Sequence, residues 1–282
     1  MTATAFIQPY KSTIVRPFIT TMTPREAALR FSEPPSPVAP RVPELEGQPL
    51  ERSTLRVGAH ELAIYRSGSG SGRHNGPVAL LAHGFGGSAA QMIAFAPGLL
   101  AAGFRVVTFD QPGHGFSPGR YSHLLEFSRS IAAVADAFGV RTVVAHSLGA
   151  TATLIAHARG LSLERAVLIA PPGNVEHFAS AFAAHIGLAR EQLPSMLAEV
   201  EREFGFPLRL LDVRNLLSIA EVSPAELLVM HDEADAEVPY AHARDLVEHW
   251  PNARLQTLNG LGHRRVLRDA SAVADAVAHL TR

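Results

Sequence analysis

Residues 142–150 read Thr-Val-Val-Ala-His-Ser-Leu-Gly-Ala, and this stretch decides the fold. The apolar, β-branched run stops abruptly at Ser147, with small residues two positions before it (Ala145) and two positions after it (Gly149). An alanine-rich helical pattern then continues to Arg159. This order predicts a strand, a tight turn and a helix. Such a turn presents the serine hydroxyl at the carboxyl end of the strand, where the free N–H groups of the helix N-terminus also point.

The pentapeptide at 145–149 resembles the nucleophile elbow of the α/β-hydrolase family, which is usually written G-x-S-x-G. Here alanine replaces the first glycine, and small bulk is what that position requires. A serine that only caps a helix N-terminus gives a similar pattern, so the pentapeptide needs support from other motifs.

The remainder of the chain from Pro77 alternates between short apolar runs and helical patterns, which is typical of a parallel sheet with crossover helices. The expected strands are the elbow strand, 78–82, 104–109, 166–170, 226–230 and 253–258, after a hairpin at 52–66. The expected helices include 88–102, opened by Ser88, 122–138, opened by Ser122, 240–250 and a last helix to Leu280. The fold class is therefore α/β, and the resemblance implies a mostly parallel, eight-stranded-type sheet flanked by helices.

Residues 171–222 show helical periodicity and no strand pattern, with candidate helices at 175–186, 191–204 and 208–219. An insertion between sheet strands at this point would lie above the carboxyl edge of the sheet, where open α/β folds bind ligands. The predicted organisation is a proline-rich arm (1–50), a hydrolase core (51–173 and 223–282) and a small helical cap (174–222).

The arm contains nine of the 20 prolines. Thr23 and Pro24 predict a short helix over 24–31, because threonine is a good helix cap and proline suits the first helical position. The rest of the arm is expected to be extended, and a packed or loose arm is favoured over a docking role. The glycine-serine run at 68–72 reads as a flexible loop, since no strand-to-helix transition surrounds it to make a dinucleotide site.

A serine, an acid and a histidine follow one another in the order that this family uses for its catalytic triad. The residues are Ser147, Asp235 and His263, each just past the carboxyl end of a predicted strand. The block from His231 to Pro239 resembles the family pattern H-G-x-x-D-x-x-V-P, and Asp232, which replaces the glycine, is the reserve candidate for the acid. The block ending at His263 resembles the family's G-x-G-H.

The segment His83-Gly84-Phe85-Gly86-Gly87 resembles the H-G-x-x-G loop of the same family. By this match the N–H of Phe85, together with the N–H of Leu148, forms the oxyanion hole. His83 is expected to be structural. Asp110 opens a segment that matches the D-x-P-G-x-G turn, and it is also expected to be structural.

Substrate contacts are expected from the cap and from the residue beside the nucleophile. Phe178 and Phe182 are candidates to line an apolar acyl pocket, although the same side chains are equally suited to dock the cap on the sheet. His146 either contacts the substrate or packs under the elbow, and the sequence leaves both readings open.

Composition limits the remaining function classes. The 282 residues have a net charge of −1, which gives no basic footprint for nucleic acid or a membrane surface. The chain has no cysteine, no apolar run of the length of a membrane span, no metal-ligand spacing and no signal-peptide pattern over 1–21. We therefore expect no metal, no cofactor and no membrane span, and a cytoplasmic location. The expected partner is a small-molecule substrate, and a homo-oligomer is possible.

Taken together, these motifs predict a serine hydrolase that cleaves a carboxylic ester or thioester through an acyl-enzyme. A C–C bond hydrolase or an acyltransferase would use the same triad. A non-catalytic ligand-binding protein on the same scaffold is the alternative from another class.

Overall fold

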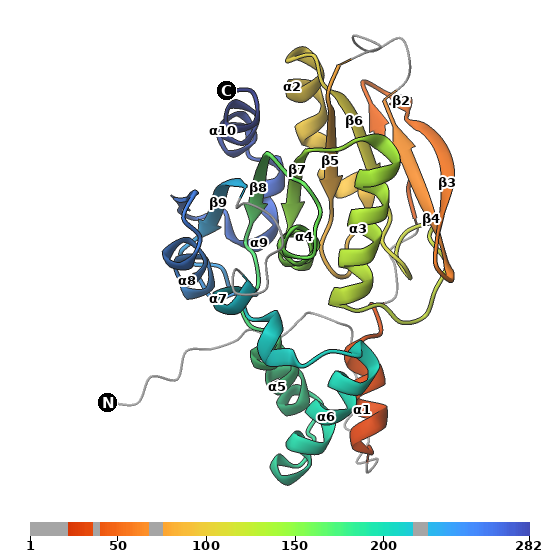
Figure 1. Cartoon of the computed structure of the whole chain (residues 1–282), viewed down its shortest axis with the longest axis vertical. Helices are drawn as coiled ribbons and strands as arrows, with labels where there is room; N and C mark the ends of the chain where they lie inside the picture. The colour runs from red at the N-terminus through yellow and green to blue at the C-terminus, as the bar shows by residue number, and fades with distance from the viewer. Residues whose placement is uncertain (1–21, 36–39, 68–75, 217–224) are drawn as a thin grey trace.

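A mostly parallel sheet forms the centre of the molecule (Figure 1). The structure is a computed structural model, and it describes residues 22–35, 40–67, 76–216 and 225–282. Its eight strands lie in the order β10-β9-β8-β7-β5-β6-β4-β3. β4 runs antiparallel to both of its neighbours, β3 and β6, and the other neighbouring strands of this sheet are parallel. β1 and β2 form a separate antiparallel pair. The predicted α/β class and the eight-stranded, mostly parallel sheet are confirmed. The strands are β1 (Glu44–Leu45), β2 (Gln48–Pro49), β3 (Glu51–Val57), β4 (His60–Arg66), β5 (Val78–Ala82), β6 (Arg105–Phe109), β7 (Thr142–His146), β8 (Arg165–Ile169), β9 (Glu226–Asp232) and β10 (Ala253–Leu258).

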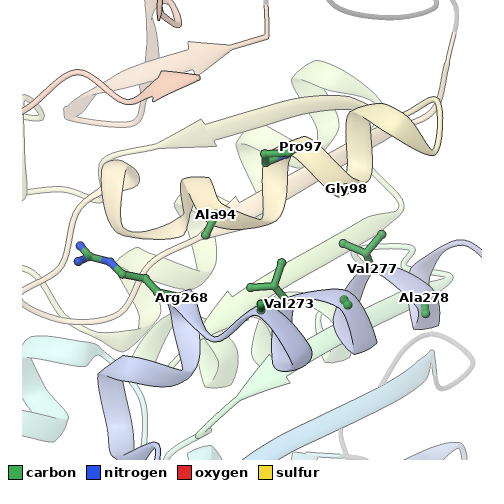
Figure 2. A pocket seen from close by; sticks show the side chains of 9 residues that line it. Ala94, Pro97, Gly98, Arg268, Val273, Val277 and Ala278 are labelled. Carbon is green, nitrogen blue, oxygen red and sulfur yellow. The ribbon is translucent and has the colours of Figure 1, made fainter. Parts of the chain in front are cut away.

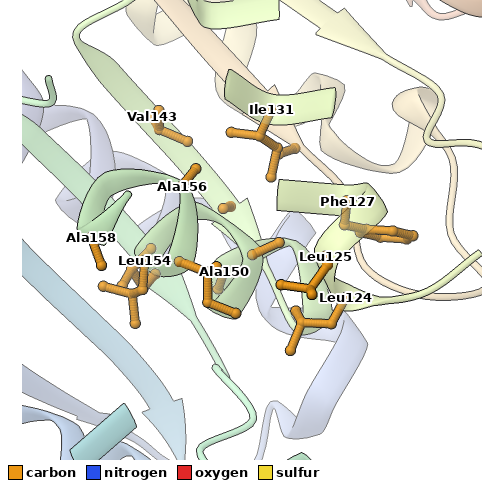
Figure 3. Packing of buried hydrophobic residues seen from close by; sticks show 14 of the residues in the cluster. Leu124, Leu125, Phe127, Ile131, Val143, Ala150, Leu154, Ala156 and Ala158 are labelled. Carbon is orange, nitrogen blue, oxygen red and sulfur yellow. The ribbon is translucent and has the colours of Figure 1, made fainter. Parts of the chain in front are cut away.

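The central strands are apolar along their whole length because helices cover both faces of the sheet. Alternate residues of one strand enter different cores: Leu80 and Val143 pack with α3 and α4, whereas Leu81 and Val144 pack with α2 and α10. Figure 3 shows the first of these cores, where side chains from α3, α4 and β7 meet. The helical elements are α1 (Pro24–Phe31), η1 (Ala89–Phe95), α2 (Ala96–Ala101), α3 (Leu124–Phe138), α4 (Leu148–Ala158), α5 (Val175–His185), η2 (Arg190–Gln192), α6 (Leu193–Phe204), η3 (Leu208–Leu211), α7 (Val213–Leu216), α8 (Ala241–His249), α9 (Gly262–Arg265), η5 (Val266–Arg268) and α10 (Ala270–Leu280).

Two helix starts differ from the prediction. The single helix expected over 88–102 is a 3₁₀ segment followed by α2, and the Ser88 side chain makes no capping hydrogen bond. Pro97 accounts for the break, since proline has no N–H and its ring clashes with the preceding turn of an α-helix. The helix expected from Ser122 begins at Leu124 instead, because His123 and Glu126 form its capping box.

The helical excursion between β8 and β9 is built from α5, α6 and α7, below the sheet in the view of Figure 1. In α6 the residues at helical spacing, Met196, Val200 and Phe204, are buried. The third candidate helix, over 208–219, is shorter than expected: it is divided into η3 and α7, and positions 217–224 lie outside the described residues.

Helix α1 belongs to the same layer as these helices, although it comes from the predicted arm. It begins as expected, with Thr23 in a reciprocal capping box with Glu26 and proline in the first turn. It packs against α6 and contacts α5, and the Phe31 ring lies 5.6 Å from the Phe182 ring. A hydrogen bond of 2.7 Å from the Ser122 N–H to the Ser32 carbonyl connects the end of α1 to the core. The sequence did not indicate that this helix packs against α5 and α6.

An open apolar groove runs along the opposite face of the sheet, between η1–α2 and α10 (Figure 2). Pro97, Val273 and Val277 line it, and Arg268 lies at one end. Gly98 allows the helices to approach, because a Cβ there would lie 3.0 Å from a Val277 methyl carbon. None of its lining residues belongs to the predicted catalytic set.

The glycine-serine loop at 68–72 and the segment searched for a signal peptide, 1–21, lie outside the described residues. Over the ranges that the structure describes, no helix has both the length and the apolar character needed to span a membrane.

Candidate active site

Ser147 lies in the turn between β7 and α4, and its backbone conformation is strained. Its φ of 51° and ψ of −126° place a non-glycine residue in a region that costs about 1–3 kcal/mol. The turn is held closely: a Cβ on Gly149 would lie 2.4 Å from the His83 carbonyl oxygen, and one on Gly84 would lie 2.7 Å from the Ser147 Cβ. The Ser147 N–H also donates to the Ile169 carbonyl at 2.8 Å. The strand end, two glycines and the neighbouring strand therefore fix the serine at the carboxyl edge of the sheet.

Two buried histidines fix the loop that carries Phe85. The His83 ring accepts a hydrogen bond from the Gln111 N–H (3.0 Å) and donates to the Gly84 carbonyl (2.7 Å). The His114 ring accepts from the Gly86 N–H (2.9 Å) and donates to the Pro112 carbonyl (2.8 Å). Each ring needs one protonated and one bare nitrogen for these bonds, so both are neutral.

Phe85 and Leu148, the two predicted oxyanion donors, follow strands β5 and β7. Leu148 is the first residue of α4, so its N–H has no partner inside that helix. Phe85 lies in the loop after β5, between the hydrogen-bonded Gly84 and Gly86.

Asp110 is part of the scaffold. Its carboxylate accepts hydrogen bonds from the Tyr65 hydroxyl (2.7 Å), the Ala89 N–H (2.8 Å) and the Phe116 N–H (2.9 Å). This agrees with the structural role expected for it.

Asp235 and His263 meet across the loops that follow β9 and β10. His263 Nδ1 lies 2.8 Å from Asp235 Oδ2, while Asp235 Oδ1 accepts from the N–H groups of Glu237 (2.8 Å) and Val238 (3.0 Å). The Nε2 of His231 donates to the Val238 carbonyl at 3.0 Å and lies 3.4 Å from Asp235 Oδ2. Burial alone would raise the pKa of Asp235, but the hydrogen bonds from His231 and His263 hold it below its usual range.

The reserve acid, Asp232, has a different function. Its two oxygens accept from the Ala234 N–H (2.9 Å) and the Leu261 N–H (2.6 Å), so it joins the β9 loop to the loop before His263. The carboxylate that the structure places against His263 is that of Asp235.

The three candidate substrate-binding residues lie in different surroundings. His146 is 4% exposed and contacts the backbone of His263, with Nε2 2.9 Å from its carbonyl oxygen. Phe178 is half-buried, with its ring 5.7 Å from that of His242. Phe182 is half-buried against Phe31 of α1.

Ser147 makes no hydrogen bond to His263 in the part of the chain that the structure describes, although His263 lies beside His146, the residue before the serine. Within the same ranges, no group of three or more His, Asp or Glu side chains is arranged to hold a metal ion.

Sequence reasoning missed the roles of His114 and His231. Both were visible as members of family-like blocks, but nothing in the sequence distinguished a histidine that ties a loop from one of the other histidines of the chain. Only the paired acceptor and donor contacts of His114, and the approach of His231 to Asp235, identify them.

The buried neutral histidines give a prediction for stability against pH. Burial lowers the pKa of His83 to about 4 and that of His114 to about 3, from an ordinary value of 6.5. In the unfolded chain these histidines therefore become protonated near pH 6.5. In the folded chain they become protonated only at a lower pH. Stability is fully present above pH 6.5 and should fall as the pH drops toward 4, by roughly 1 kcal/mol per pH unit for each such histidine.

Urea unfolding at pH 7.5, 6.0 and 5.0 checks this expectation, because carboxylates titrate mostly below that window. The variant His114→Gln should show a shallower fall than the wild type, with His185→Gln, an exposed position on α5, as the matched substitution. An unfolding midpoint that stays constant between pH 7.5 and 5.0 would contradict the neutral assignment.

Two protein-family models match parts of the chain. The model of the alpha/beta hydrolase fold family matches residues 77–177, and that of a family described as TAP-like protein matches residues 212–281. A search of curated proteins found no match.

Solved structures give the same fold. An esterase from Pyrococcus furiosus is 18% identical, with a TM-score of 0.63 over 89% of this chain and 98% of that one. A proline iminopeptidase-related protein from Thermus thermophilus is 24% identical, with a TM-score of 0.56 over 82% and 98%. Epoxide hydrolase A from Mycobacterium thermoresistibile is 17% identical, with a TM-score of 0.58 over 82% and 98%. These structures share the fold of the chain, and the match of the alpha/beta hydrolase fold model to residues 77–177 supports its place in the α/β-hydrolase superfamily.

Proposed function

We propose that this α/β hydrolase is a serine hydrolase that cleaves carboxylic esters or thioesters through an acyl-enzyme. Ser147 Oγ attacks the carbonyl carbon while His263 Nε2 takes its proton. The same histidine then protonates the departing alcohol or thiol. Water, activated by His263, attacks the acyl carbon, releases the acid and restores the Ser147 hydroxyl.

The observation that carries this proposal is the 2.8 Å contact between His263 Nδ1 and Asp235 Oδ2. A carboxylate only accepts, so the hydrogen lies on Nδ1 and the lone pair of the neutral ring lies on Nε2. This is the tautomer that a general base requires. Asp235 has no exposed side-chain surface and its pKa lies below the usual range, so it remains an anion that stabilises the imidazolium formed during the reaction.

The developing oxyanion is assigned to the N–H groups of Phe85 and Leu148. His83 and His114 hold the loop that carries Phe85, and Leu148 is fixed as the first residue of α4. Donors fixed before the reaction need no reorganisation as charge develops, and one such donor is typically worth about 10²–10³-fold in rate.

The acyl group is assigned to the side of the sheet on which α5 and α6 lie, beyond the carboxyl ends of the parallel strands (Figure 1). Phe178 and Phe182 remain our candidates for apolar contacts there. The contact of Phe182 with Phe31 favours a part for this residue in holding α1 in the cap.

Labelling with a fluorophosphonate probe tests the proposal directly, because the phosphorus takes the place of the acyl carbon and fluoride leaves as Ser147 Oγ bonds to it. We expect one covalent label per chain, located on Ser147 by peptide mass spectrometry. Denatured protein is the control for non-specific labelling. An absence of label on Ser147 in the folded protein would reject a serine nucleophile.

Substrate class is then resolved with p-nitrophenyl esters of increasing acyl length, a matched thioester series and a prolyl anilide. The ester and thioester series should be hydrolysed and the anilide should be a poor substrate. Faster cleavage of the anilide would instead favour a peptidase of the kind named among the similar structures.

A further inference from the structure

A buried histidine outside the triad holds the loop that carries the proposed base. His146 is the last residue of β7 and immediately precedes Ser147, while His263 lies 117 residues further along the chain, in α9. The Nε2 of His146 lies 2.9 Å from the carbonyl oxygen of His263. The two rings pack with centroids 4.6 Å apart at 47°.

The direction of this hydrogen bond follows from the atoms involved. A carbonyl oxygen only accepts, so Nε2 of His146 carries the hydrogen and donates it. Burial, and the proximity of His263, lower the pKa of His146 to about 3, so the ring is neutral at the pH at which a histidine base works. The ring thus presents one N–H at a fixed place, on a strand end that is itself hydrogen-bonded within the sheet.

The loop around His263 needs such a contact. Gly260 and Gly262, which lie between β10 and His263, have positive φ angles of 75° and 63°, so a glycine turn leads into the four-residue helix α9 that carries His263. Asp232 holds Leu261 from one side. Asp235 holds the imidazole of His263, and Arg264 and Arg265 beside it contact Glu237 and the Gly260 carbonyl. All of these partners lie in the loops after β9 and β10, so none of them connects His263 to the serine turn after β7.

We propose that His146 is a positioning residue, which fixes the backbone of His263 relative to the Ser147 elbow through its Nε2–H hydrogen bond. This rests on the proposed function. His263 is then attached at two points, its ring to Asp235 and its carbonyl to His146. Because His146 immediately precedes Ser147 in the chain, its side chain sets the separation between the nucleophile Ser147 and the base His263.

The expected consequence concerns turnover more than binding. Geometry in the reacting pair is exacting, and a misplacement of about 1 Å can cost about 10²-fold in rate. The substrate does not depend on this hydrogen bond for its own contacts, so KM should change little. A residue that served only the stability of the fold would not separate the two constants in this way.

The test compares His146→Gln with His146→Met. The two side chains have the same length and similar volume, but only glutamine has an N–H near the position of Nε2. We expect His146→Met to lower kcat by about 10–100-fold with KM within about threefold, and His146→Gln to recover most of the loss. His146→Phe, which keeps a ring, is the second variant without a donor, for use if the methionine variant does not fold.

Two further measurements keep the outcomes separate. The Nδ1 proton of His263 should exchange with water faster in His146→Met than in His146→Gln. NMR measures this rate from the proton resonance and requires no substrate. Equal kcat values and equal exchange rates in the two folded variants would overturn the role of His146. A wild-type protein that the fluorophosphonate does not label would overturn the proposed function instead.

Discussion

Replacing Ser147 with alanine is expected to lower ester turnover by about 10⁴–10⁶-fold, because removal of a triad nucleophile leaves only the binding site and the oxyanion donors. In the proposed mechanism the hydroxyl oxygen of Ser147 forms the acyl bond, and alanine has no atom that could do so. Initial rates with a p-nitrophenyl ester, together with loss of the fluorophosphonate label, measure the effect.

Ser271→Ala is the matched control for this substitution. Ser271 is exposed in the first turn of α10, and its hydroxyl is removed by the same chemical change. Its turnover should equal that of the wild type. Near-normal ester cleavage by Ser147→Ala would show that another group attacks the substrate.

Replacing Asp235 with asparagine is expected to cost about 10⁴-fold in kcat, because it forces the wrong histidine tautomer. Two backbone N–H groups donate to Asp235 Oδ1, so the amide oxygen must take that position. The amide nitrogen then faces His263 Nδ1, which has to accept a hydrogen bond. The ring hydrogen moves to Nε2, and the lone pair that should receive the serine proton is lost. Steady-state rates and the rate of fluorophosphonate labelling should fall together.

Asp232→Asn is the companion variant, since Asp232 is the last residue of β9, three residues before Asp235, and its carboxylate also lies close to the loop of His263. Both of its oxygens accept backbone N–H groups, from Ala234 and Leu261, so the amide must lose one of these hydrogen bonds and should lower the unfolding midpoint. The tautomer of His263 is untouched, so its loss of turnover should be far smaller than that of Asp235→Asn. Equal losses in the two variants would argue that Asp235 acts only through loop stability.

The sequence predicted the sheet and its connections because buried parallel strands are short, apolar and bounded by turn residues. The five strands from β5 to β9 follow directly from such runs. The choice of Asp235 over Asp232 came from a family-like block rather than from physics. The structure supplies the physical reason, namely that the backbone N–H groups of two different loops already occupy Asp232.

What the sequence could not provide is contact between distant segments. The donation from His146 to the His263 carbonyl joins residues 117 positions apart, and a side chain that binds a backbone atom leaves no trace in the identity of its partner. The predicted start of α3 was wrong for a local reason, since His123 rather than Ser122 is the cap residue and pairs with Glu126 in the first turn.

The membership of α1 in the cap has a consequence for the order in which the protein assembles. An eight-residue helix is too short to persist alone in water, so α1 gains stability only on docking against α6. More than 150 residues must leave the ribosome between the two. The earliest described helix to be synthesised therefore cannot reach its packed position until α6 has been translated, when the central strands β5, β7 and β8 have already left the ribosome.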